Sequence, residues 1–333
     1  MRFLEALLSH ALRWKRLLSS NPVLARAMHA VERRESFEDI TLHEEMLADP
    51  VRLAAYHAAI QRYVTSQDCV VDVGTGTGIL AFFAAAKKPR KVYAIDHSKK
   101  MLDYARAAAE ANGIADLTFV ASASYRFRPA EPIDVIVQEQ MGIGLFDEGM
   151  VEAILDLRDR CLKPGGRILP AKFEFYLEPV QLVERERIPL IQEQQIHGLK
   201  FPSPLTPPDS VYYFREIYPR DVEFLICDPE PVFTFDLCTL TVGQIPKRLS
   251  VSKPVGRRGE VSGICMYFKA VFDDEISFCT GPDAVKTHWP MLLYRTPARL
   301  YGVGEIFQMQ VELPELSEHL CWSWTIGGQD NAG

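Results

Sequence analysis

The sequence has no Cys-x-x-Cys pair, no long apolar run and no excess of positive charge. Its seven cysteines are scattered, so we expect reduced cysteines in a cytoplasmic protein and no zinc site. No segment approaches the roughly 20 apolar residues of a membrane span, and no membrane contact is expected. The formal net charge is −7, whereas proteins that bind nucleic acid directly usually carry an excess of positive charge. No direct nucleic-acid binding is therefore expected.

The length and composition allow one large domain or two ordinary ones. The chain has 333 residues, of which 47% are hydrophobic and 24% are charged, as in soluble globular proteins. Residues 1–64 are expected to form amphipathic helices, first over 4–30 and then over about 43–63, because apolar residues recur there at helical spacing. Charged residues interrupt the first apolar pattern, which therefore does not resemble a signal peptide.

Residues 65–170 alternate between strand-like and helix-like segments. Short apolar, β-branched runs predict strands, and longer amphipathic segments follow most of them. This alternation predicts a parallel, doubly wound sheet. The expected strands cover 69–73, 91–95, 117–120, 133–137 and the residues before Pro170, and the expected helices start at Ile79, Met101 and Met150.

The texture changes after Pro170. Partly alternating segments at 172–178, 233–237, 263–268 and 307–311 predict that 171–333 is mainly antiparallel and barrel-like. The segment 187–225 interrupts this pattern with six prolines and many polar residues, and we interpret it as an inserted arm.

A glycine loop lies between the first strand and the first helix of the parallel sheet. In Gly74-Thr-Gly-Thr-Gly78, glycines allow a ligand to approach the backbone closely. Asp96 ends the next strand, where α/β folds bind a ribose hydroxyl pair, so a dinucleotide is one candidate. However, Ile79 stands where the dinucleotide motif has its last glycine. Asp72 would also repel a pyrophosphate, whereas it could help to bind a cationic, amine-bearing ligand.

Two glutamates bracket another glycine-bearing loop, directly after the fourth strand. Glu139 and Glu148 lie nine positions apart and can converge on one point. Such a pair suits a guanidinium, which offers two faces of N–H donors to carboxylates. The alternative is a pair of solvated surface glutamates.

Three of these elements together resemble class I S-adenosylmethionine-dependent methyltransferases. They are the loop 72–78, Asp96 and the Leu-Lys-Pro-Gly-Gly turn at 162–166. The resemblance implies a Rossmann-like domain that binds S-adenosylmethionine.

The stretch 139–150 narrows the resemblance to protein arginine N-methyltransferases, because it is similar to their double-glutamate loop. Residues 42–52 resemble the segment that folds over the cofactor in this family, and 286–289 match its Thr-His-Trp loop. The resemblance covers about 36–326. It implies N-terminal helices that act as a cofactor lid, a Rossmann-like domain, a mainly antiparallel β-barrel that binds substrate, and a homodimer formed through the arm.

The resemblance also implies roles for individual residues. His43 and Met46 would line the cofactor site, and Arg52 would pair with the carboxylate at the cofactor's methionine end. Ser124 would stand where the family contacts the adenine amino group. The expected cofactor residues are His43, Met46, Arg52, Asp72, Gly74, Gly76, Asp96 and Ser124.

The expected catalytic residues are Glu139, Glu148, His288 and Asp49. His288 would pair with Asp49 and help to remove a proton, although a capped loop histidine is the alternative. Trp289 belongs either to the site or to barrel packing. Met46 and Met150 match the methionines of family members that make asymmetric dimethylarginine, and core packing is the alternative for both.

The sequence differs from the family pattern in residues expected around the two glutamates and the cofactor. Arg33-Arg-Glu-Ser-Phe37 replaces an aromatic lid of the form Tyr-Phe-x-x-Tyr, Gln140 replaces a tryptophan and Ser124 replaces a glutamate. The expected function is methylation of arginine in a protein or peptide. The departures leave two alternatives open: a methyltransferase of a small guanidino or amine compound, and an inactive cofactor-binding scaffold.

Overall fold

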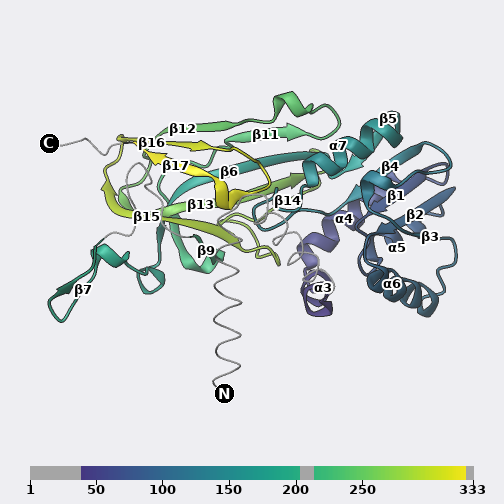
Figure 1. Ribbon diagram of the computed structural model, residues 1–333, viewed down its shortest axis with the longest axis horizontal. Coiled ribbons are helices and arrows are strands. Elements are labelled where there is room, and N and C mark those ends of the chain that lie inside the picture. Colours follow the sequence, from purple (N-terminus) through teal and green to yellow (C-terminus); the bar gives the residue numbers. More distant parts are fainter. Residues whose placement is uncertain (1–38, 203–213, 328–333) are drawn as a thin grey trace, which may run out of the picture.

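The computed structural model describes residues 39–202 and 214–327. A parallel sheet with its helices forms one end of the molecule, and antiparallel strands form the other (Figure 1). This arrangement confirms the fold class expected from the sequence. The expected helices at 4–30 and the altered lid at 33–37 lie outside the described residues.

The helix expected over about 43–63 is two helices, α3 (Ile40–Leu47) and α4 (Pro50–Tyr63). The expectation of one helix was wrong because Pro50 has no N–H to continue a helix. Asp49 instead starts α4 as its N-cap, and its carboxylate accepts a hydrogen bond of 3.0 Å from the N–H of Arg52. The break places Asp49 and Arg52 together at the first turn of α4.

The parallel sheet has the strand order β3-β2-β1-β4-β5. Its central strand β1 is buried along its whole length, which explains its unbroken apolar sequence. The order reverses between β1 and β4, the position where open α/β sheets bind ligands. The strands are β1 (Cys69–Val73), β2 (Lys91–Asp96), β3 (Thr118–Ala121), β4 (Ile133–Gln138) and β5 (Leu162–Leu169), and the helices between them are α5 (Ile79–Ala85), α6 (Lys99–Ala111) and α7 (Met150–Cys161).

The second part contains a seven-stranded and a three-stranded antiparallel sheet. The larger sheet has the order β10-β6-β13-β15-β9, with β11 beside β6 and β14 beside β13, and the smaller has the order β12-β16-β17. The larger sheet comprises β6 (Lys172–Leu182), β9 (Phe214–Ile217), β10 (Val222–Leu225), β11 (Phe233–Asp236), β13 (Gly259–Val271), β14 (Ser277–Cys279) and β15 (Met291–Tyr301). The smaller comprises β12 (Arg248–Pro254), β16 (Ile306–Glu312) and β17 (Ser323–Ile326).

The arm expected at 187–225 is only partly separate from these sheets. Its last part forms β9 and β10, which pair with β15 and β6. The hairpin of β7 (Gln195–Ile196) and β8 (Leu199–Lys200) does project from the body (Figure 1). The domain division at 64 and 170 stays a prediction.

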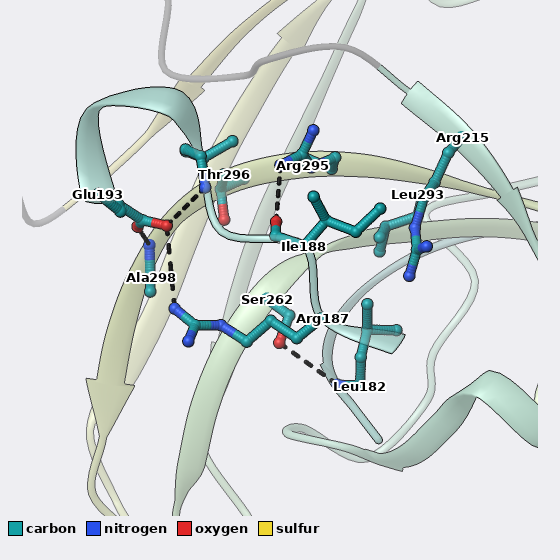
Figure 2. Close-up of a pocket in the computed structure, with 11 residues that line it drawn as sticks. Leu182, Arg187, Ile188, Glu193, Arg215, Ser262, Leu293, Arg295, Thr296 and Ala298 are labelled. Carbon is teal, nitrogen blue, oxygen red and sulfur yellow. Dashed lines mark hydrogen bonds and ion pairs between the residues drawn. The ribbon is translucent and has the colours of Figure 1, made fainter. Parts of the chain in front are cut away.

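The base of the arm is fastened to β15 (Figure 2). Arg295 donates a hydrogen bond of 2.6 Å to the carbonyl of Ile188. The carboxylate of Glu193 accepts one of 2.8 Å from the N–H of Ala298 and lies 3.8 Å from Arg187. These contacts fix the segment from which the hairpin extends.

No helix in residues 39–202 or 214–327 is both long and apolar enough to cross a membrane. The cytoplasmic location and the lack of a nucleic-acid partner stay predictions.

Candidate active site

The glycine loop follows β1 and turns through left-handed backbone torsions. Gly76 has a φ of +51°, and a Cβ placed on it would lie 2.8 Å from Cε1 of His43. Such a contact is closer than carbon atoms tolerate, so only glycine lets the loop pass under α3. His43, expected at the cofactor, therefore lies directly against the expected cofactor loop.

Asp72 shapes this loop from inside. Its carboxylate accepts hydrogen bonds from the Thr75 hydroxyl at 2.6 Å and from the N–H of Ala81 at 3.1 Å. Burial raises the pKa of Asp72 to about 7, although these hydrogen bonds oppose the shift. The carboxylate thus binds its own loop, and a contact with an amine-bearing ligand stays a prediction.

Asp96 holds the same loop from the end of β2. Its two oxygens accept hydrogen bonds from the N–H of Gly76 at 3.0 Å and from the N–H of Ser98 at 2.8 Å. Ser124 begins the short 3₁₀ turn after β3, where its carbonyl accepts a hydrogen bond of 2.9 Å from Arg160. Ribose and adenine contacts by Asp96 and Ser124 stay predictions.

Arg52 lies between the two expected sites. Its Nε donates to Oε1 of Glu139 at 3.1 Å, and its Nη1 donates to the carbonyl of Met46 at 3.2 Å. Burial alone would lower the pKa of Arg52, but Glu139 outweighs this and raises it. This buried ion pair holds one carboxylate oxygen of Glu139 and joins α4 to the end of β4.

Glu139 and Glu148 line one cavity of about 370 Å³, at the junction of the parallel sheet and the antiparallel part. The structure therefore brings the two glutamates, Met46 and His288 together. Among the described residues, five carboxylates and one imidazole line this space, which makes it acidic. The lining residues are Leu42, Glu45, Met46, Glu139, Met141, Gly142, Ile143, Asp147, Glu148, Glu216, Tyr218, His288, Trp289 and Pro290.

The antiparallel part reaches this cavity through the Thr-His-Trp loop. Both Nδ1 and the backbone N–H of His288 lie 2.9 Å from Oδ2 of Asp49. Burial alone would raise the pKa of Asp49, but the hydrogen bonds from His288 and from the Arg52 backbone lower it overall. Because the ionised carboxylate only accepts, Nδ1 carries the proton and Nε2 of the neutral ring can accept another.

Trp289 serves both alternatives considered for it. Its ring stacks on Phe278 with centroids 5.4 Å apart, and its Nε1 donates to the carbonyl of Met141 at 2.8 Å. It therefore packs in the barrel and also holds the loop from Glu139 to Glu148, called the clamp loop below, in place. Of the two methionines, Met46 lines the cavity, whereas Met150 is fully buried in the core.

Gln140 connects the clamp loop with the glycine loop. A Cβ on Gly74 would lie 3.6 Å from its Nε2. Its Oε1 is buried and has no hydrogen-bond partner within the described part of the chain. A buried acceptor without a donor is costly, so a ligand that brings an N–H or O–H to this point would fit.

The sequence reasoning missed several residues of the cavity, among them Glu45, Asp147, Glu216 and Tyr218. Asp147 precedes Glu148 inside the recognised loop, which was an available signal. Glu216 and Tyr218 reach the cavity because β9 pairs with β15, and no local sequence pattern predicts that pairing.

Known proteins resemble this chain over most of its length. Residues 70–166 match the family model described as a methyltransferase domain. A Danio rerio protein arginine N-methyltransferase 6 is 31% identical over 86% of each chain. A Dictyostelium discoideum protein arginine N-methyltransferase 1 is 30% identical over 77% of this chain and 76% of its own.

Solved structures agree with these relatives. A Trypanosoma brucei PRMT1 enzyme–prozyme heterotetrameric complex with AdoHcy is 25% identical, with a TM-score of 0.69 over 83% of this chain and 89% of that one. A structure of PRMT6 with SAH has a TM-score of 0.63 over 86% of this chain and 98% of that one; at 17% identity it supports the fold alone. The chain therefore belongs to the protein arginine N-methyltransferases, the S-adenosylmethionine-dependent family that its motifs predicted.

Proposed function

We propose that this protein transfers a methyl group from S-adenosylmethionine to the guanidinium of an arginine in a protein or peptide, which Glu139 and Glu148 hold between them. The observation that carries the proposal is the shared cavity. Both glutamates line it together with His288, directly beside the glycine loop.

The two glutamates, Glu139 and Glu148, would lower the main barrier to methylating a guanidinium. A guanidinium is a poor nucleophile because its lone pair is delocalised and its pKa exceeds about 12. Bound S-adenosylmethionine supplies a methyl group on a sulfonium, so two cations must meet. Two carboxylates offset that repulsion, and paired hydrogen bonds to them orient the remaining guanidinium nitrogen toward the methyl group.

The residues beside the glycine loop fit this cofactor. Gly76 brings the loop backbone directly against the ring of His43, and the buried Oε1 of Gln140, which has no hydrogen-bond partner among the described residues, can accept a hydrogen bond from the cofactor's amino group. Arg52 carries five N–H donors, of which Nε donates to Glu139 and Nη1 to the carbonyl of Met46, so its guanidinium has further donors to offer a carboxylate.

His288 is suited to take the proton that the guanidinium must lose. Asp49 holds the proton on Nδ1 and leaves Nε2 as the acceptor. The same carboxylate stabilises the imidazolium that forms. Asp49 would thus orient the base rather than contact the substrate.

One assay tests the proposal. The protein is incubated with radiolabelled S-adenosylmethionine and an arginine-rich peptide, with free arginine and with the same peptide carrying lysine for arginine. We expect label on the arginine peptide alone. Label only on free arginine would favour a small-molecule methyltransferase. Binding of the cofactor by calorimetry with no label anywhere would favour an inactive scaffold.

We further propose that the protein forms a homodimer through the arm. Ile196 and Leu199, on the β7–β8 hairpin, are 48% and 65% exposed, so their burial against a second copy would be favourable. Ile196→Glu combined with Leu199→Glu should yield monomers in light scattering. Val242→Glu, at a 70% exposed position elsewhere, is the matched control and should remain dimeric. A monomeric wild type would refute the dimer.

A further inference from the structure

Asp147 is the organising side chain of the clamp loop. Its Oδ2 accepts a hydrogen bond of 2.7 Å from the N–H of Gly144, and a Cβ on Gly144 would lie 2.5 Å from Oδ1. The loop therefore folds around this carboxylate, which a side chain at 144 would displace. Because Asp147 directly precedes Glu148, its position sets where the second clamp glutamate begins.

The antiparallel part holds the other oxygen of Asp147. Nδ1 of His319 lies 2.9 Å from Oδ1, although the two residues are 172 positions apart. An ionised carboxylate can only accept, so Nδ1 of His319 is the donor. His319 belongs to the short 3₁₀ turn His319–Cys321, which leads into β17.

Aromatic side chains fix the ring of His319 in place. The ring of Phe214 in β9 lies 5.3 Å away, edge to face, and the rings of Tyr294 and Trp322 lie 6.5 Å away. The side chain of His319 is 15% exposed, and its Nε2 is buried without a hydrogen-bond partner in the described residues. The contact with Asp147 is therefore the polar contact that orients this ring.

We propose that His319 is a positioning residue for the clamp: through Asp147 it holds Glu148 at the spacing from Glu139 that a guanidinium requires. This inference rests on the proposed function. Glu139 is fixed separately, by Arg52, so the two glutamates are held by opposite parts of the molecule. Loss of His319 then disturbs the recognition of arginine and leaves the cofactor side intact.

The variants His319→Ala and His319→Asn separate this role from packing. The amide N–H of asparagine can replace Nδ1, so His319→Asn should recover much of what His319→Ala loses. We expect His319→Ala to lower kcat/KM for an arginine peptide roughly 10- to 100-fold, the usual range for losing a hydrogen bond to a charged group. Affinity for S-adenosylhomocysteine, measured by calorimetry, should stay within about twofold.

A double-mutant cycle with Asp147→Asn tests the pair itself. If His319 acts through Asp147, the second substitution adds little to the first. Cys321→Ser, at an exposed position of the same turn, is the matched control and should behave as the wild type. Additive effects, or wild-type kcat/KM in His319→Ala, would overturn the proposal.

Hydrogen exchange gives a readout that does not depend on activity. His319→Ala should speed exchange over residues 140–149, which include the Gly144 amide, and leave residues 70–80 unchanged. If the wild type methylates no arginine, the proposed function fails, but this measurement still tests whether His319 holds the clamp loop through Asp147. Unchanged exchange over 140–149 would refute that role of His319 whatever the activity.

Discussion

The glycine loop and the clamp cavity lie at the ends of neighbouring strands, β1 and β4, but they are held together in different ways. The polar contacts that shape the glycine loop join residues at most 21 positions apart, such as Gly74 with Ile95 and Gly76 with Asp96. The cavity has short-range contacts too, but it also depends on contacts that join residues 87 to 239 positions apart, such as Arg52 with Glu139 and Asp49 with His288.

The two halves of the site therefore depend on different parts of the fold. The glycine loop needs β1, β2 and the helices beside them. The cavity is complete only when α3, the loop from Glu139 to Glu148 and the antiparallel part meet, since each contributes lining residues. Recognition of arginine should therefore be the more easily damaged property, and cofactor binding the more robust one.

The largest effect should come from Glu139→Gln, on the cavity side. The substitution removes one clamp charge but keeps an oxygen that can accept from Arg52. We expect turnover to fall by about 10³-fold or more, as when a charge-stabilising group is lost from an active site, with cofactor affinity nearly unchanged. Glu110→Gln, an exposed position of α6, makes the same charge change and should have no effect. Near wild-type turnover in Glu139→Gln would refute the clamp.

A smaller effect should follow Gly76→Ala, in the glycine loop. This substitution should weaken cofactor binding, the property that Glu139→Gln leaves nearly unchanged. The added Cβ would lie 2.8 Å from His43, so the loop or α3 must shift. We expect cofactor affinity to fall at least about tenfold by calorimetry, through lost close approach of the backbone.

Gly113→Ala is the control for Gly76→Ala. Gly113 has a similar positive φ of +66° but open space around its Cβ position. It should therefore lower stability slightly without changing cofactor affinity. Equal losses of affinity in the two variants would mean that backbone strain, rather than the contact with His43, causes the effect.

The smallest effect concerns the pH dependence of folding stability. The contribution of Asp72, in the glycine loop region, should fall as pH rises, whereas that of Asp49, beside the cavity, should rise. The pKa of Asp72 is raised to about 7 by burial, so the unfolded chain, with its ordinary pKa of 3.8, binds fewer protons between these values. Asp72 therefore favours folding less as pH rises from about 4 to 7. Asp72→Asn keeps an acceptor for Thr75 and Ala81, and its melting temperature should gain roughly 3–5 °C on the wild type between pH 5 and 8.

Asp49 has a lowered pKa, because its hydrogen bonds outweigh its burial. Its stabilising contribution is present above the ordinary pKa of 3.8 and is lost as pH falls through the lower, folded value. Asp49→Asn should therefore melt below the wild type at pH 6, and the gap should close only below about pH 4. The same pH trend in both variants would contradict these opposite environments.

The part of the site that sequence could predict is the part with local patterns. The strand end at Val73, the strand expected over 133–137, which the structure extends to Gln138, and the helix from Met150 to Cys161 follow from apolar runs and turn residues. The break at Asp49-Pro50 was missed, although proline and aspartate announce it. Asp147 stood inside the recognised loop, but its partner His319 could not be inferred, because nothing local links positions 172 residues apart.

The local sequence is enough to predict the alternation of strands and helices, the glycine loop and the presence of two glutamates nine positions apart. These features follow from backbone torsion preferences and the period of apolar residues, which act over a few residues. The pairing of Glu139 with Arg52, of Asp49 with His288 and of Asp147 with His319 is visible only in the folded protein. Such contacts depend on how the antiparallel part packs on the parallel sheet, and that packing buries charges only where partners from distant segments meet.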